Sequence, residues 1–253
     1  MANWSDPRPG AARPDTGPFG TAARASVADA RDQGLRSYML SVYNMMASGV
    51  LLTGIVALAF AWGGRDSLAA QVFVNGGPLK YLIIFAPLAF VFGISFGAFR
   101  MSTTALHALF WGYAAVMGLS LSTIFLVYSP IAIAQAFAAT AAGFGALSLY
   151  GYTTKRDLSA FGTFLIVGVV GLLVASIINM FVHSGPFAML ISFVGVLLFA
   201  GLTAYDTQKT KSLYFQVAGT GNEGRVVVLS ALNLYLDFIN MFLFILRLFG
   251  NRN

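Results

Sequence analysis

The 253-residue sequence contains no cysteine and few charged residues. Without cysteine the chain has no disulfide, no thiolate nucleophile and no thiolate metal site. Charged residues make up only 9% of the sequence, whereas soluble domains carry about 25%. Hydrophobic residues make up 58%. The composition therefore predicts that most of the chain lies in a lipid bilayer, which is its first expected partner.

The formal net charge is +6, yet the sequence lacks the basic patches interleaved with aromatic residues that are typical of nucleic-acid binders. We therefore expect no nucleic-acid partner. The positive charges are better interpreted as signals of membrane topology. Nothing in the sequence favours a particular oligomeric state.

Residues 1–36 are rich in Arg, Asp, Pro, Gly and Ala and contain no continuous apolar stretch. This composition cannot bury enough apolar surface to fold, so we expect a disordered N-terminal tail in the cytoplasm. The tail also lacks the apolar core and cleavage site of a signal peptide. Residues 37–253 are expected to form one transmembrane domain.

A helix needs about 20 apolar residues to cross a bilayer. Seven segments meet this requirement: residues 39–62, 81–99, 105–128, 131–151, 160–182, 187–208 and 226–247. These runs are much longer than the strands of a membrane β-barrel, which have about ten residues. We therefore predict an all-α membrane protein with seven transmembrane helices.

The distribution of Lys and Arg predicts the orientation of these helices, because cytoplasmic loops carry an excess of both residues. With the N-terminus in the cytoplasm, the cytoplasmic side holds eleven basic residues: Arg8, Arg13, Arg24, Arg31, Arg36, Arg100, Lys155, Arg156, Lys209, Lys211 and Arg225. The other side holds four: Arg65, Lys80, Arg247 and Arg252. The odd number of helices then places the C-terminus outside.

The last predicted helix carries a polar stripe. Its polar residues recur on one helical face: Ser230, Asn233, Asp237, Asn240 and Arg247. A helix surrounded by lipid would not carry this stripe, so the C-terminal helix is predicted to lie centrally in the bundle. Ser and Asn also hold membrane helices together, by about 0.6 kcal/mol per contact. That alternative stays open for Ser230, Asn233 and Asn240.

Two acidic residues lie in the apolar part of the chain, Asp206 in GLTAYDTQK and Asp237 in LYLDFIN. Each lies about fifteen residues from a turn near Gly221, so an antiparallel hairpin would bring both to a similar depth. An ionisable residue inside a membrane is a functional-site hypothesis by default. The alternative for Asp206 is an interfacial acid that pairs with Lys209 or Lys211.

Two carboxyl groups in one poorly solvated site cannot easily both ionise, so the pair is expected to hold one proton between them. The same oxygens could bind a hard cation such as Ca²⁺, which takes six to eight oxygen ligands. Asn233, Asn240 and backbone carbonyls would be further ligands. We expect no cofactor other than Ca²⁺ as a permeant ion.

Three segments carry a resemblance to a known family: SLYGYTTKRDLSAFG (148–162), GLTAYDTQKTK (201–211) and LYLDFINMFLFILRLFGNR (234–252). They resemble the Bax inhibitor family, also called the transmembrane Bax inhibitor motif family, and its bacterial inner-membrane branch most of all. The resemblance implies seven helices, with the seventh surrounded by the other six. It also implies a pH-sensitive Ca²⁺ leak gated by an aspartate pair, which the motifs place at Asp206 and Asp237.

Arg100 follows the second predicted helix. The resemblance implies that this end of the helix approaches the aspartate pair in a closed state, where a basic residue would hydrogen-bond an aspartate. Arg100 is therefore a candidate for stabilising the gate. The alternative is a basic anchor whose side chain extends to the lipid headgroups.

Two other functions stay open. Intramembrane aspartyl proteases also use two membrane aspartates, one of them in a Tyr-Asp pair like Tyr205-Asp206. However, Leu234-Tyr235-Leu236 stands where those proteases carry Gly-x-Gly, and no Pro-Ala-Leu follows, so we do not expect an enzyme. The third hypothesis is a non-conducting regulator that binds another membrane protein, such as a membrane protease.

Overall fold

The computed structural model describes residues 18–250, except residues 75 and 99. All regular elements of the described residues are helices: α1 (Pro18–Phe60), the 3-10 helix η1 (Gly64–Asp66), α2 (Leu68–Phe73), α3 (Pro78–Gly97), α4 (Thr103–Leu121), α5 (Ile124–Val127), α6 (Pro130–Thr153), α7 (Ser159–Val182), α8 (Gly185–Val217) and α9 (Glu223–Phe249). Seven of them are long and apolar enough to cross a membrane, within the described residues. The prediction of an all-α, seven-span membrane protein is confirmed.

Serine N-caps determine where several of these helices begin. The side chains of Ser102, Ser129 and Ser184 each accept a hydrogen bond from the backbone N–H three residues further on. This bond satisfies one of the unpaired N–H groups at a helix start. Pro130 and Pro186 then occupy the first turns of α6 and α8, where a missing N–H costs little.

Helix α1 begins earlier than the sequence predicted. Residues 18–36 were expected to be disordered, yet they form the first part of α1. The expectation considered only the lack of apolar surface. The segment from Thr21 to Arg36 is rich in Ala and Arg, which are strong helix formers, and it continues directly into the first membrane span. The rest of the predicted tail, residues 1–17, lies outside the described residues.

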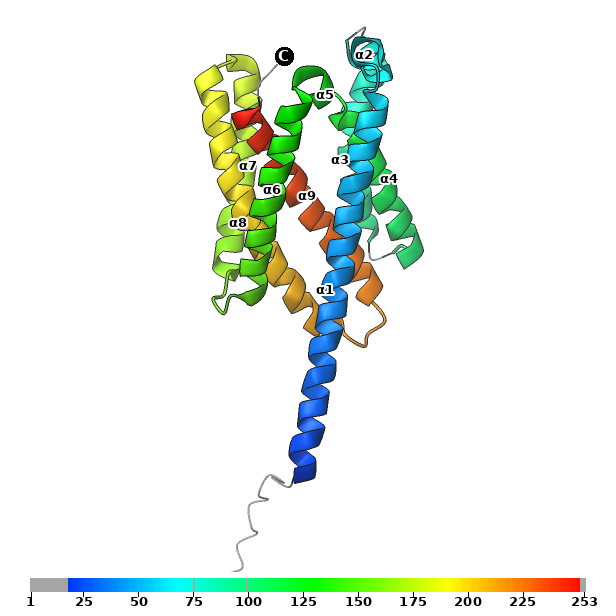
Figure 1. Cartoon of the computed structure of the whole chain (residues 1–253), viewed down its shortest axis with the longest axis vertical. Helices are drawn as coiled ribbons and strands as arrows, with labels where there is room; N and C mark the ends of the chain where they lie inside the picture. Colours follow the sequence, from blue (N-terminus) through cyan, green and yellow to red (C-terminus); the bar gives the residue numbers. More distant parts are fainter. Residues whose placement is uncertain (1–17, 75, 99, 251–253) are drawn as a thin grey trace, which may run out of the picture.

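Tertiary contacts also hold this part of α1. Arg31 lies 4.9 Å from the ring centroid of Phe215 on α8, a cation–π contact. The rings of Tyr38 and Tyr214 are 5.4 Å apart, and Leu35 is buried. Residues 31–38 of α1 therefore pack on the end of α8, whereas the first turns of α1 extend away from the bundle (Figure 1).

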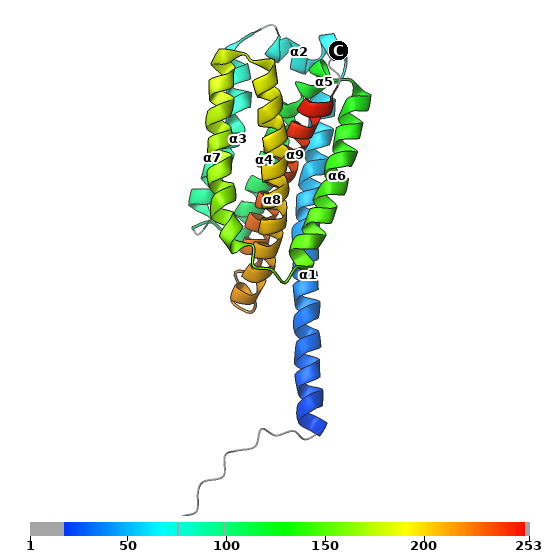
Figure 2. The ribbon, with the colours of Figure 1, turned by 90° about the vertical axis from the view of Figure 1, so that its left-hand side faces the viewer.

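Helix α9 occupies the centre of the bundle, as Figures 1 and 2 show. It packs against α1, α4, α6 and α8, and it is the most buried of the seven spans. Helix α3 packs on α4, and α7 packs on α8. The prediction of a central C-terminal helix is confirmed, with α3 and α7 in an outer layer.

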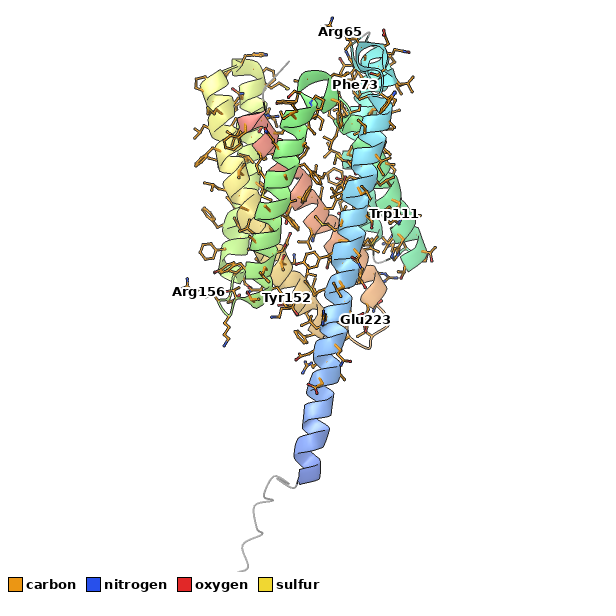
Figure 3. The ribbon with its side chains drawn as sticks, in the orientation of Figure 1. Arg65, Phe73, Trp111, Tyr152, Arg156 and Glu223 are labelled. Carbon is orange, nitrogen blue, oxygen red and sulfur yellow. The ribbon has the colours of Figure 1, made fainter. Side chains whose placement is uncertain are left out.

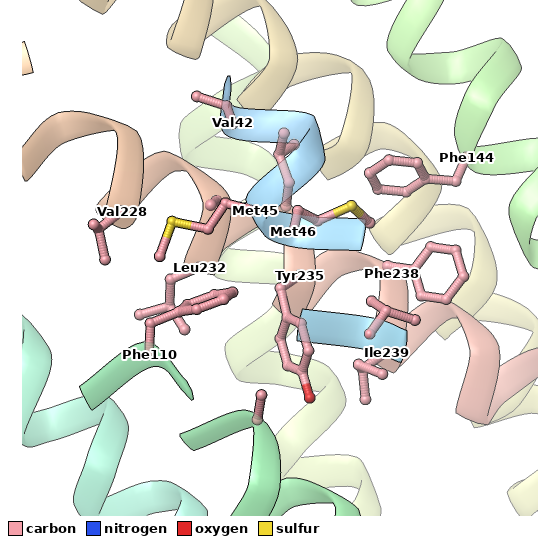
Figure 4. Close-up of a cluster of buried hydrophobic side chains, with 14 of the residues drawn as sticks. Val42, Met45, Met46, Phe110, Phe144, Val228, Leu232, Tyr235, Phe238 and Ile239 are labelled. Carbon is pink, nitrogen blue, oxygen red and sulfur yellow. The ribbon is translucent and has the colours of Figure 1, made fainter. Parts of the chain in front are cut away.

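The two sides of α9 pack through aromatic residues. On one side, Tyr235 contacts Phe110 and Tyr113 of α4 edge-on, with ring centroids 6.0 and 5.4 Å apart. On the other side, Phe238 contacts Phe144 of α6, with centroids 5.5 Å apart. Figure 4 shows that side chains of α1 complete this core between α4 and α6. The packing therefore fixes the rotation of α9 about its own axis.

Basic residues gather at one end of the bundle. Figure 3 places Arg156 at the end that also carries Glu223, and Arg65 at the opposite end. The α3–α4, α6–α7 and α8–α9 connections lie at the first of these ends. Most of the described basic residues belong to these connections, to α1, or to the parts of α8 and α9 that lead to their shared turn. This uneven distribution of basic residues between the two ends agrees with the predicted assignment of the loops to two sides of the membrane. Which end faces the cytoplasm stays a prediction.

Candidate functional site

Asp206 and Asp237 lie on the two antiparallel helices α8 and α9. Asp206 is eleven residues before Val217, where α8 ends, and Asp237 is fourteen residues after Glu223, where α9 begins. At 1.5 Å per residue, the two lie about 17 and 21 Å from the connecting turn. The hairpin therefore brings them to a similar depth, as their spacing from Gly221 predicts.

The side chains of Asp206 and Asp237 lie close enough for their carboxyl groups to interact. Asp237 is buried, with 5% of its surface exposed, and Asp206 is half-buried. The Asp237 Oδ2 atom is buried and accepts no bond from an N–H or alcohol group of the described residues. A hydrogen bond between two carboxyl groups requires a proton on one of them. The arrangement therefore suits two acids that share one proton.

Neither lysine that follows Asp206 forms a hydrogen bond or ion pair with it in the described structure. Lys209 acts on Asp206 by its charge, while its ammonium lies 5.8 Å from the ring centroid of Tyr205. Lys211 donates to the carbonyl oxygen of Tyr152 at 2.8 Å and lies over the ring of that tyrosine. Lys211 therefore joins α8 to α6, and only Lys209 affects the carboxyl pair.

Two other polar residues of the GLTAYDTQK segment, Thr207 and Gln208, connect α8 to its neighbours. The sequence analysis did not predict these connections. Gln208 accepts a hydrogen bond from the Leu158 N–H and donates to the Arg156 carbonyl, both at 2.8 Å. Thr207 donates to the Ser148 hydroxyl of α6 at 3.3 Å. The sequence held one signal for these two residues: Thr207 and Gln208 directly follow Asp206 in a membrane helix. These bonds hold the α6–α7 connection against α8 next to the carboxyl pair.

The polar stripe of α9 divides among three environments. Ser230 is buried, with its hydroxyl 3.4 Å from that of Tyr38 on α1. Asn233 is exposed, and Asn240 donates to the Leu236 carbonyl of its own helix at 2.8 Å. Ser230 therefore connects two helices, as the alternative interpretation of the stripe states.

In the described part of the chain, the two aspartates do not belong to a larger cluster of potential metal ligands. Within the described residues, no group of three or more His, Cys, Asp or Glu side chains is placed to hold a metal ion. A Ca²⁺ ion at the pair would therefore need backbone carbonyls, amide side chains or water to complete its shell.

The structure does not bring Arg100 to the carboxyl pair. Arg100 is exposed in the α3–α4 connection, at the end of the bundle, whereas the aspartates lie about 17 to 21 Å from that end. Its exposure favours the interpretation as a headgroup anchor. The basic residue that packs here is Arg225 of α9, whose Nη2 donates to the Met101 carbonyl at 3.0 Å.

Comparison with known proteins shows similarity over most of the chain. It is 46% identical over 223 residues to the inner membrane protein YbhL of Escherichia coli K12, which covers 87% of this chain and 93% of that protein. An uncharacterized protein of Rickettsia prowazekii is 42% identical over 222 residues, which are 87% of this chain and 92% of that protein. An uncharacterized membrane protein of Streptococcus pyogenes is 37% identical over 222 residues, or 88% and 96% of the two chains.

The three segments that suggested a family in the sequence are also covered by a family model. The model described as inhibitor of apoptosis-promoting Bax1 matches residues 35–253, from the first membrane span to the end of the chain. Together with the seven membrane-spanning helices, this match shows that the protein is a membrane protein of the Bax inhibitor family.

Proposed function

We propose that the protein is a pH-sensitive Ca²⁺ leak channel of a bacterial inner membrane, and that Asp206 and Asp237 form its gate. The observation that supports this most is that the two carboxyl groups lie within interaction distance of each other inside the bundle. Ionisable side chains within a membrane are costly and mark ion pathways and proton relays. A packing role alone does not need two acids at this position.

The shared proton connects gating to pH. With one proton the pair carries one negative charge and its internal hydrogen bond holds α8 next to α9. Without that proton, two like charges in a site of low dielectric repel each other. The pair then needs a cation, and Ca²⁺ prefers oxygen ligands of this kind. Protons and Ca²⁺ therefore compete for the same oxygens, and the flux depends on pH whichever step limits it.

The polar residues of α9 extend the proposed path. Asn233 is four residues before Asp237 and Asn240 is three residues after it, so their amide groups lie one turn away on the same side of the helix. Their amide oxygens would offer a permeant cation successive contacts above and below the gate. We propose no catalytic role for the pair, because the Gly-x-Gly and Pro-Ala-Leu motifs of an intramembrane aspartyl protease are not in the sequence.

Purified protein in sealed vesicles with an entrapped Ca²⁺ indicator tests this function. The channel predicts Ca²⁺ uptake well above that of protein-free vesicles, and uptake that changes between acidic and neutral pH. A non-conducting regulator of another membrane protein predicts no uptake at any pH. Correctly folded and inserted protein without uptake would therefore contradict the channel and favour the regulator.

A further inference from the structure

Helices α1 and α6 both pack on α9 (Figure 1). The side chains between α1 and α6 line a groove, which we name the α1–α6 groove. It consists of three cavities with volumes of about 580, 350 and 350 Å³. Neighbouring cavities share lining residues. The first two share Tyr43, Phe144 and Gly145, and the last two share Val50, Phe137 and Phe238. The three cavities therefore form one continuous groove.

The groove is long and narrow. Its lining runs along α1 from Arg36 to Ala57, a distance of about 32 Å at 1.5 Å per residue. The hydrocarbon core of a bilayer has a similar thickness, about 30 Å. The cavity volumes are in the range of small-molecule sites, about 300 to 1,000 Å³, and each is too small for a transmembrane helix. Two leaflets make up this core, so the extended acyl chain of one lipid fits the half of the groove that begins at Arg36.

The polar groups of the groove are at one end. Most of its wall is aliphatic or aromatic, including Phe137 and also Phe144 and Phe238 (Figure 4). The end near the start of α1 also carries the Arg36 side chain, together with Tyr43, Ser148 and Tyr152. Lys211 adds a second positive charge there through its contacts with Tyr152. The groove thus combines an apolar path with a cationic end.

We propose that the α1–α6 groove binds one anionic phospholipid. An acyl chain lies along the groove against α6 and α9, and the phosphate of the headgroup lies at Arg36. Basic pockets between membrane helices on the cytoplasmic side bind anionic headgroups, and each nearby Lys or Arg contributes about 1 kcal/mol. The cationic end of the groove is also the end at which most basic residues gather, which fits an anionic leaflet.

Two glycines of α6 provide a matched test of the acyl-chain site. A Cβ atom at Gly143 or Gly145 would meet no other atom within 4 Å, so both positions accept a side chain. Only Gly145 lines the groove. Gly145→Leu therefore places a side chain in the path of the acyl chain, and Gly143→Leu adds the same side chain outside it.

Native mass spectrometry tests the proposal. The full chain is stripped of lipid in detergent and then titrated with phosphatidylglycerol, or with phosphatidylcholine of the same acyl chains. The wild type should bind one phosphatidylglycerol several times more tightly than phosphatidylcholine. Gly145→Leu should lose this binding, and Gly143→Leu should keep it.

A second pair of variants tests the headgroup contact and does not depend on how the leucine variants fold. Arg36→Gln should weaken phosphatidylglycerol binding about fivefold and leave phosphatidylcholine unchanged. Arg156→Gln, a change in the exposed α6–α7 connection, should have no effect. Equal affinity of the wild type for both lipids would overturn the proposal. So would an unchanged preference in Arg36→Gln, or a second copy of the chain bound in place of lipid.

Discussion

Thr53 on α1 lies with its hydroxyl oxygen 2.7 Å from the hydroxyl oxygen of Tyr235 on α9. The same threonine donates its only hydroxyl proton to the Ala114 carbonyl of α4, at 2.8 Å. Tyr235 must therefore be the donor in its bond to Thr53. These two bonds connect three helices in the bundle core, where all three residues are buried.

Thr53→Val should lower the free energy of unfolding by about 1–3 kcal/mol, because it leaves the buried Tyr235 hydroxyl without an acceptor. Tyr235→Phe should cost less, about 1 kcal/mol, since Thr53 keeps its bond to Ala114. Thermal unfolding in detergent measures both. The double variant should cost less than the sum of the two, and simple additivity would contradict the shared bond.

Gly151→Ala should also destabilise the bundle. A Cβ atom at Gly151 of α6 would collide with the backbone carbonyl of Ala204 on α8, and overpacking of this kind costs about 1–3 kcal/mol. Gly145→Ala is the control, because its Cβ would meet open space, and we expect no loss of stability but a gain of up to about 1 kcal/mol, since Ala favours a helix interior over Gly. Equal melting temperatures for the two variants would show that α6 and α8 are further apart than in this structure.

The sequence predicted the fold well because the signals of membrane helices are local. Seven apolar runs gave the spans, and the polar stripe around Asp237 gave the central position of α9. The helical start of α1 was missed because its composition suggested disorder. Further along α1, Arg31 and Tyr38 contact Phe215 and Tyr214, and no local sequence pattern predicts contacts between residues so far apart in the chain.

The candidate site was predictable only in part. Equal spacing from the turn near Gly221 was enough to predict that Asp206 and Asp237 lie at the same depth. The rest of the site depends on hydrogen bonds between segments that are far apart in the sequence. Gln208 bonds to the α6–α7 connection and Arg225 to Met101, and no sequence periodicity predicts either bond. For the same reason the sequence singled out Arg100, although Arg225 makes the buried contact.

Arg225→Gln should loosen the α3–α4 connection. The variant loses the bond from Nη2 to the Met101 carbonyl, and bonds from charged donors contribute about 1.5–3 kcal/mol when buried. Amide hydrogen exchange should become faster around Met101. Arg100→Gln serves as the control, since Arg100 is exposed. If Arg100→Gln had the larger effect, Arg100 rather than Arg225 would hold this end of the bundle.

Asp157 gives a pH dependence outside the membrane. Its Oδ1 accepts a hydrogen bond from the Ser159 N–H at 2.9 Å, before the start of α7, and this bond lowers the pKa of the Asp157 carboxyl. Because the pKa is lowered, the bond contributes fully to stability at any pH above the ordinary carboxyl pKa of about 3.9. This contribution is lost as the pH falls through the lowered pKa of the folded protein. Protection of the Ser159 amide, its exchange rate compared with the intrinsic rate at the same pH, should decrease on acidification, and Asp157→Asn should remove most of that dependence. The same exchange profile in the variant would contradict the bond.

The most direct test of the proposed gate is the pH profile of Ca²⁺ uptake into vesicles that contain wild type, Asp206→Asn, Asp237→Asn or the double variant. Asn keeps the shape of the side chain and removes the shared proton. Each single variant should flatten the profile, and the double variant should add little, because coupled groups are not additive. Asp157→Asn, an exposed acid outside the membrane, should keep the wild-type profile. Single variants that both retain the wild-type profile would contradict an aspartate gate.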